Sequence, residues 1–106
     1  MFTRIVECTI KPELKDNFRD ALSSKVLPAI NKQPGFVDLI GLVSDDLSDH
    51  ALVITLWHSK EDADRLYHQT EPVVDLLTPF LTKSPGVEQF YVTTSVSHRI
   101  AVGRAA

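Results

Sequence analysis

The stretch ALVITLWHSKEDADRLYHQ, residues 51–69, changes from one hydrophobic period to another. Its first part, residues 51–57, is apolar at nearly every position and rich in branched side chains, which is typical of a strand buried on both faces. From Ser59 onward, charged and apolar residues alternate at the spacing of an amphipathic helix. Ser59 is the expected N-cap, because its hydroxyl can accept a hydrogen bond from a first-turn amide, and Asp62 occupies the third helical position. The stretch therefore predicts a strand followed directly by a capped helix.

The rest of the chain repeats these two patterns. Apolar runs predict three further strands, at residues 2–10, 36–44 and 87–96. A four-residue repeat predicts a first helix whose core-facing stripe is Leu14, Phe18, Leu22, Val26 and Ile30. Pro28 should kink the end of this helix, and Pro34 with Gly35 should terminate it. The helix after Ser59 should break at Glu71 and Pro72 and resume as far as Phe80 or Leu81.

The order of these elements is βαββαβ, which predicts an α+β ferredoxin-like domain with a four-stranded antiparallel sheet and both helices on one face. The strand at 51–57 is nevertheless apolar on both faces. In the strand before it, strict alternation places Val37, Leu39 and Val43 on one face and Phe36, Ile40 and Leu42 on the other. Because two helices cover only one face, we expect the second face to pack against another copy, forming a homodimer and a dimeric α+β barrel.

Whole-chain properties narrow the possible functions. A chain of 106 residues that is 43% hydrophobic and 24% charged suits one domain, which we assign to residues 1–97, with a C-terminal tail at 98–106. The net charge of −3 and the scattered basic residues predict no nucleic-acid partner. No apolar stretch reaches the length of about 18 residues expected of a membrane span. Cys8 is the single cysteine and is expected to be a buried hydrophobe, so we expect a cytoplasmic protein.

The motifs of cofactor chemistry are missing from the sequence. The four histidines, His50, His58, His68 and His98, lack the spacing of metal ligands. There is no glycine-rich phosphate loop, nucleophile elbow or paired-cysteine motif. We therefore expect no metal and no cofactor.

Two segments resemble a known family. The segment VLPAINKQPGF, residues 26–36, with its following strand and Ser44-Asp45-Asp46, is similar to the helix-end segment of antibiotic biosynthesis monooxygenase (ABM) domains. Residues 54–57, ITLW, and 59–63, SKEDA, resemble the family's strand that ends in a tryptophan before a capped helix. The resemblance covers about residues 2–96 and implies the same fold and the same dimer.

The resemblance implies a cofactor-independent oxygenase that oxidises electron-rich phenols to quinones. Such a substrate, once deprotonated, can itself donate an electron to dioxygen, so the protein supplies a base, hydrogen-bond donors and an apolar pocket. Trp57 corresponds to the family's tryptophan. Many members carry a histidine nine residues later, where this chain has Leu66, with His68 two residues further on. A haem-degrading branch resembles the chain less, because Leu66 and Leu76 occupy the helical positions that this branch uses.

The candidate catalytic residues are Trp57, which would shape the site, and Tyr67 or His68, which would assist deprotonation of a small aromatic substrate. Each also has a structural interpretation: core packing for Trp57 and Tyr67, and a solvated position for His68. Candidate pocket residues between helices and sheet are Phe18, Leu22, Phe80 and Phe90. Two other functions suit the same fold: a non-catalytic ligand-binding or stress-associated dimer, and an isomerase with a proton-shuttling histidine aimed into the pocket.

Overall fold

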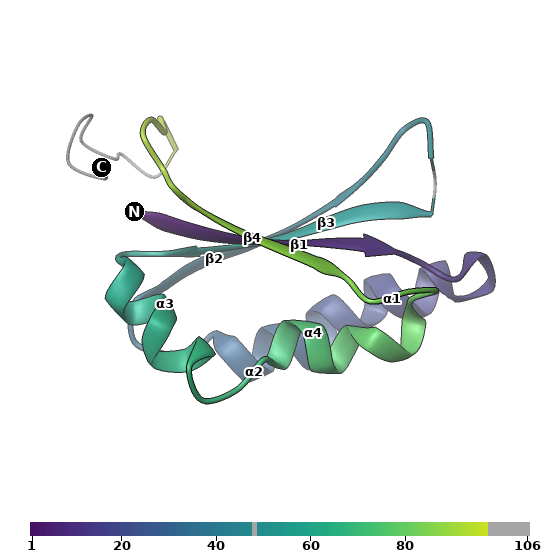
Figure 1. Cartoon of the computed structure of the whole chain (residues 1–106), viewed down its shortest axis with the longest axis horizontal. Coiled ribbons are helices and arrows are strands. Elements are labelled where there is room, and N and C mark those ends of the chain that lie inside the picture. The colour runs from purple at the N-terminus through teal and green to yellow at the C-terminus, as the bar shows by residue number, and fades with distance from the viewer. Residues whose placement is uncertain (48, 98–106) are drawn as a thin grey trace.

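The structure, a computed structural model, describes residues 1–47 and 49–97 and contains one antiparallel four-stranded sheet (Figure 1). The predicted tail at 98–106, with His98, lies outside the described residues. The strands are β1 (Phe2–Thr9), β2 (Phe36–Val43), β3 (His50–Trp57) and β4 (Gly86–Tyr91). Their order in the sheet is β2-β3-β1-β4, and each neighbouring pair is antiparallel. The predicted α+β ferredoxin-like architecture is therefore confirmed, although β4 ends at Tyr91, well before residue 96.

All the helical segments lie on the same face of the sheet (Figure 1). They are η1 (Pro12–Leu14), α1 (Lys15–Ala21), η2 (Leu22–Val26), α2 (Leu27–Ile30), α3 (Lys60–Tyr67), α4 (Pro72–Leu77) and η3 (Thr78–Phe80). The segments α1, η2 and α2 follow one another directly, and η2 is a wide π-helical turn just before Pro28. A proline has no amide hydrogen for the turn before it and crowds that turn, so the widening accommodates the predicted kink.

The second helical region follows the signals in its sequence. The Ser59 hydroxyl accepts a hydrogen bond from the Asp62 amide at 3.1 Å, which confirms the predicted N-cap of α3. The region is interrupted before Pro72, which stands in the first turn of α4, where its missing amide hydrogen costs no helical hydrogen bond. The cap and the break therefore place α3 beside the end of β3.

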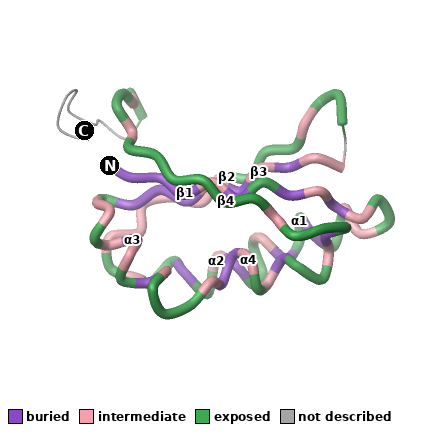
Figure 2. Tube along the Cα trace, in the orientation of Figure 1, coloured by how far each residue is buried: buried purple, intermediate pink, exposed green. Residues whose placement is uncertain are grey.

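The hydrophobic core fills the space between the sheet and the helices, where the buried segments of Figure 2 face one another. Its largest fully buried side chains include Trp57, Ile10, Ile30, Leu77, Val6, Val26, Val53, Val73 and Cys8. Cys8 is 1% exposed, and burial, with a smaller contribution from the charge of Glu7, raises the pKa of its thiol to about 11. Cys8 is therefore a neutral packing residue, as its place in an alternating strand predicted.

One prediction about β2 is wrong. Strict alternation placed Phe36 on the face opposite Leu39 and Val43, but the register shifts between Phe36 and Asp38, so that Val37 is an extra residue in the strand. Phe36 is consequently paired with Trp57, and its ring packs on the same helix-facing side. A β-bulge of this kind reverses the alternation of all residues before it.

The other face of the sheet is uncovered and apolar. Ile54 pairs with Ile5 on one side and Ile40 on the other, which places three isoleucines in a row across three strands. Leu42 and Phe90 on the same face are 46% and 47% exposed. The predicted second apolar face is therefore present, with no part of the described chain packed on it.

We expect Gly35→Ala to destabilise the fold. Gly35 has a φ of 85°, and a Cβ at this position would collide with the Asp62 carboxyl group. The left-handed backbone alone costs an alanine about 1–2 kcal/mol, so the free energy of unfolding in urea should fall by at least that amount. Gly86→Ala is a matched control, because its added Cβ would meet only the Glu7 Cβ at 3.9 Å. Equal stabilities of the two variants would contradict this account.

Candidate functional site

Three aromatic rings lie in series where β3 ends. The Trp57 ring meets the Phe36 ring edge to face at a centroid distance of 5.6 Å and the Tyr67 ring in the same manner at 5.7 Å. Trp57 is fully buried, and its indole Nε1 donates a hydrogen bond to the Thr55 hydroxyl at 3.2 Å. Aromatic pairs in this geometry are stabilised by about 0.5–1.5 kcal/mol beyond their buried area. Strand β2, strand β3 and helix α3 are thus fastened together through one side chain.

The buried Thr55 hydroxyl connects the two polar tips of this series. It lies 3.2 Å from the Tyr67 hydroxyl and 3.4 Å from the Arg4 carbonyl oxygen, in addition to its contact with Trp57. Burial raises the pKa of the Tyr67 phenol, and this effect outweighs the opposing hydrogen bond from Thr55 and the charge of Arg4. Tyr67 is consequently a neutral phenol near neutral pH, able to donate or accept one hydrogen bond.

A partly buried ion pair lies beneath Tyr67. The Arg4 guanidinium carbon is 4.0 Å from the centre of the Tyr67 ring, and its Nη2 donates to Glu71 Oε2 at 2.6 Å. Arg4 Nη1 and Glu71 Oε1 are also buried, and neither has a hydrogen-bond partner within residues 1–47 and 49–97. Burial raises the pKa of Glu71, because the loss of hydration outweighs the attraction of Arg4. The pair links β1 to the break between α3 and α4.

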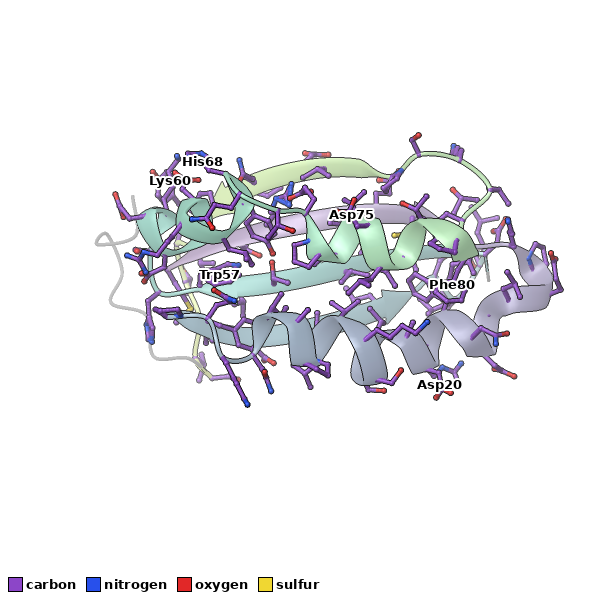
Figure 3. The ribbon with its side chains drawn as sticks, turned by 90° about the horizontal axis from the view of Figure 1, so that it is seen from below. Asp20, Trp57, Lys60, His68, Asp75 and Phe80 are labelled. Atoms are coloured by element: carbon purple, nitrogen blue, oxygen red, sulfur yellow. The ribbon has the colours of Figure 1, made fainter. Side chains whose placement is uncertain are left out.

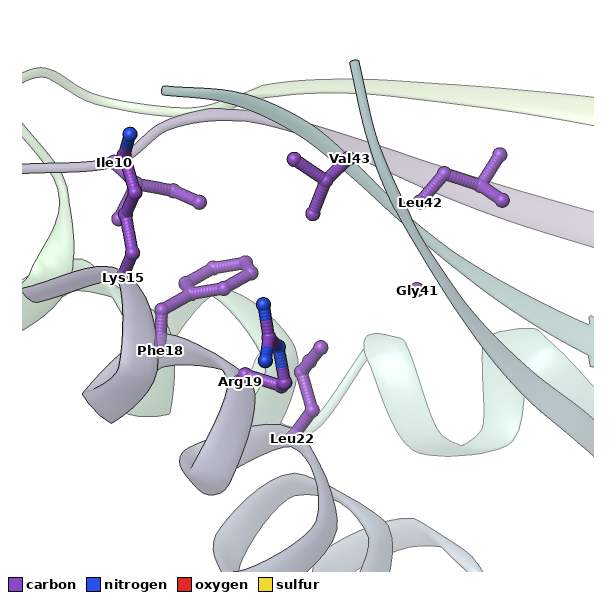
Figure 4. A pocket seen from close by; sticks show the side chains of 8 residues that line it. All are labelled: Ile10, Lys15, Phe18, Arg19, Leu22, Gly41, Leu42 and Val43. Carbon is purple, nitrogen blue, oxygen red and sulfur yellow. The ribbon is translucent and has the colours of Figure 1, made fainter. Parts of the chain in front are cut away.

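A groove runs between the first helical region and the edge strand β2. It has two hollows of about 220 and 450 Å³ that share Arg19, Leu22 and Gly41. The first hollow, drawn in Figure 4, is further lined by Ile10, Lys15, Phe18, Leu42 and Val43. The second is further lined by Ser23, Leu27, Phe36, Val37, Asp38 and Leu39. The groove is therefore mainly apolar, with charged side chains at few positions.

Gly41 keeps this groove open. It belongs to the helix-facing set of β2 because it pairs with the buried Val53, yet it presents no side chain there. A Cβ at this position would lie 3.0 Å from the Leu22 Cδ1, closer than side chains normally pack. Phe36 lines the second hollow and also contacts Trp57, so the groove wall leads directly into the aromatic series.

The structure brings together only some of the predicted site residues. Trp57 and Tyr67 are in contact, whereas the side chain of His68 is 77% exposed and its Nε2 lies 3.8 Å from Asp64 Oδ1. Figure 3 shows His68 beside Lys60, at the same end of the molecule as Trp57 but apart from it. His68 is thus positioned as the solvated interpretation predicted.

The four predicted pocket residues divide among three places. Phe18 and Leu22 line the groove. Phe80 is a partly buried residue at the core margin, with the Lys25 ammonium 5.8 Å from its ring centre. Phe90 lies on the uncovered face with Ile5, because β4 directs it away from the helices. A pocket between helices and sheet therefore cannot include Phe90, which corrects that placement.

Sequence reasoning missed Arg4, Thr55, Glu71, Arg19 and Gly41. The first two carried a detectable signal, because each is the polar residue among otherwise apolar helix-facing positions at the centre of its strand. Gly41 carried a weaker one, as a glycine within a strand. The described part of the chain contains no group of three or more metal-ligating side chains and no helix able to cross a membrane.

Comparisons with known proteins agree on one family. The family model of the antibiotic biosynthesis monooxygenases matches residues 1–73. A Bordetella bronchiseptica protein of that group superposes with a TM-score of 0.75 and 11% identity, covering 88% of this chain and 97% of its own. A mutant of SnoaB, a cofactor-independent oxygenase from Streptomyces nogalater, superposes with a TM-score of 0.74 and 18% identity. The match covers 90% of this chain and 95% of that one. At such identities these structures show a shared fold. No curated protein matches the chain in sequence.

We expect Glu71→Gln to remove one component of the pH dependence of stability. Folded Glu71 holds its proton to a higher pH than unfolded Glu71, because burial raises its pKa. The native free energy of unfolding, relative to that of Glu71→Gln, should decrease as pH rises from the unfolded pKa through the folded one.

Asp64→Asn provides the opposite control. The hydrogen bond from Lys60 lowers the pKa of Asp64, so native stability relative to Asp64→Asn should increase as pH rises through the acidic range. Urea unfolding at a series of pH values measures both differences. If the two stability differences changed with pH in the same direction, the raised pKa assigned to Glu71 would be contradicted.

Proposed function

Because the chain belongs to the antibiotic biosynthesis monooxygenase family, we propose that it is a cofactor-independent monooxygenase acting on a small phenolic or quinol-like molecule. The observation that carries this proposal is the apolar groove whose wall, at Phe36, continues into Trp57 and Tyr67. An apolar cavity of about 150 Å³ is enough to bind benzene. The two hollows, of about 220 and 450 Å³, therefore provide room for a molecule of one or two rings.

The proposed reaction requires little from the protein beyond binding. The deprotonated phenol donates an electron to dioxygen, a ring carbon forms a bond to oxygen, and cleavage of the O–O bond releases water and leaves a quinone. Apolar walls such as Phe18 and Leu22 would exclude bulk water from this sequence. One phenol and one dioxygen thus yield one quinone and one water, with no external reductant.

The candidate residues would contribute unequally. Tyr67 is favoured over His68, because it packs on Trp57 while His68 faces solvent. Tyr67 reaches the groove only through Trp57 and Phe36, so we assign it a positioning role. Trp57 would support the groove wall from behind, which accords with its complete burial.

The two alternative functions differ in their support. The isomerase hypothesis requires a histidine aimed into the pocket, and the residues that line the two hollows include none. Non-catalytic binding in the same groove is favoured by the scarcity of bases, since Asp38 and Lys15 are the lining residues that could accept a proton from a substrate. Oxygen consumption separates this alternative from the monooxygenase.

We further propose that the protein is a homodimer that pairs through the uncovered sheet face. The row formed by Ile40, Ile54 and Ile5, flanked by exposed Leu42 and Phe90, is an apolar surface for which the described chain provides no cover. A small chain also gains stability from such burial. The resemblance to ABM domains implies the same arrangement.

We expect Gly41→Leu to slow the oxidation of hydroquinones. A leucine here would fill the space between β2 and Leu22, so kcat/KM should fall by more than about tenfold, which corresponds to a loss of about 1.4 kcal/mol. Oxygen consumption in an electrode cell measures the rate. Asp20→Leu places the same side chain at an exposed position of α1, and its rate should equal that of the native protein. A native protein that consumed no oxygen with any hydroquinone would contradict the proposed activity.

We expect the native protein to have twice its chain mass of 11.8 kDa in light scattering. Ile54→Glu should yield the monomer, because it places a charge at the centre of the apolar row. Leu47→Glu is the control, since Leu47 is 62% exposed in the turn between β2 and β3. A native mass equal to the monomer would refute the dimer.

A further inference from the structure

The charged side chains around the groove are unevenly distributed. The first hollow is lined by two cationic side chains, Lys15 and Arg19, and by no acidic one. Its other lining residues are Gly41 and apolar side chains. This positive lining belongs to a chain whose formal net charge is −3. The sign of the charge at this groove is thus opposite to that of the whole molecule.

Arg19 is the more informative of the two cations. It lines both hollows, and Figure 4 shows its side chain rising between Phe18 and Leu22 toward β2. No hydrogen bond or ion pair ties its guanidinium to any residue of the described chain. Asp38, the acidic residue of the second hollow, accepts a hydrogen bond from the Leu39 amide at 2.8 Å. The guanidinium of Arg19 is therefore available to a bound molecule.

The chemistry of a guanidinium beside apolar walls favours one kind of ligand. Its planar set of donors matches the two oxygens of a carboxylate, and such charge-assisted hydrogen bonds are stronger than neutral ones. Partial exclusion of water by Phe18, Leu22 and Val43 strengthens the attraction further. An aromatic ring on these side chains would bring a carboxylate on its edge to Arg19.

We infer that the groove binds an aromatic carboxylate, with the ring on Phe18, Leu22 and Val43 and the carboxylate on Arg19. The inference rests on the proposed function, because it assigns a substrate class to the same groove.

The test compares 2,5-dihydroxybenzoate with its neutral methyl ester by isothermal titration calorimetry. The native protein should bind the acid at least about tenfold more tightly than the ester. Arg19→Gln should lose that preference and leave the affinity for the ester unchanged. Arg65→Gln is the matched control: it removes the same charge from α3, where Arg65 pairs with Asp62 at 2.9 Å, and it should keep the preference.

Gly41→Leu should weaken binding of both molecules, which locates them in the groove. Equal native affinities for acid and ester, or a preference that survives Arg19→Gln, would overturn the inference, as would acid binding unaffected by Gly41→Leu. The proposed oxygenase activity can be refuted independently of the ligand class. Preferential binding of the acid without oxygen consumption would support the ligand class and refute the activity. Oxidation of the ester without any preference for the acid would support the activity and refute the ligand class.

Discussion

The burial of Trp57 is the constraint on which the arrangement of the groove depends. Trp57 is the last residue of β3, where its backbone is in register with Phe2 on β1 and Phe36 on β2. Its indole packs against the rings of Phe36 on β2 and Tyr67 on α3, and its hydrogen-bond donor is satisfied within the core by Thr55. Replacing a ring of this size by a small side chain typically costs about 3–5 kcal/mol, a large share of the stability of a small domain. Movement of Trp57 would also move Phe36, the residue that joins the core to the groove.

The groove itself results from missing side-chain volume. The bulge in β2 turns Phe36 toward Trp57, and two residues beyond Leu39 the helix-facing position is a glycine. Leu22 stands opposite Gly41 on a wide π-helical turn, a feature that often accompanies functional sites. The same helix thus packs tightly through Phe18 and Val26 while leaving a hollow beside Leu22.

The sequence predicts the features that depend on local periodicity. The strand ending at Trp57, the Ser59 cap and the break at Pro72 all follow from short patterns, and the structure has each of them. The side of Phe36 was predicted wrongly, because a bulge reverses the alternation without a distinctive residue. Each step along a helix turns the side chain by about 100°, so the sequence places Tyr67 nearer the core than His68, but it does not show which of the two faces a cavity. Phe18 and Leu22 were predicted to line a pocket between helices and sheet, but its position beside β2 was not predictable, because it depends on which helix residue faces Gly41.

Two arginines on the helix side of the sheet show how the surroundings of a charge determine its role. Arg4 is 9% exposed, lies against the Tyr67 ring and pairs with Glu71, so its charge is compensated within the fold. Removing Glu71 would leave the Arg4 guanidinium buried without a compensating charge, so the pair holds Arg4 in its place against Tyr67. Arg19 stands at a solvent-exposed position of α1. Hydration there stabilises the unpaired guanidinium, so it has little free-energy cost in the absence of a bound anion. A buried cation can therefore hold the site in shape, whereas only an exposed cation at the groove can exchange water for a ligand.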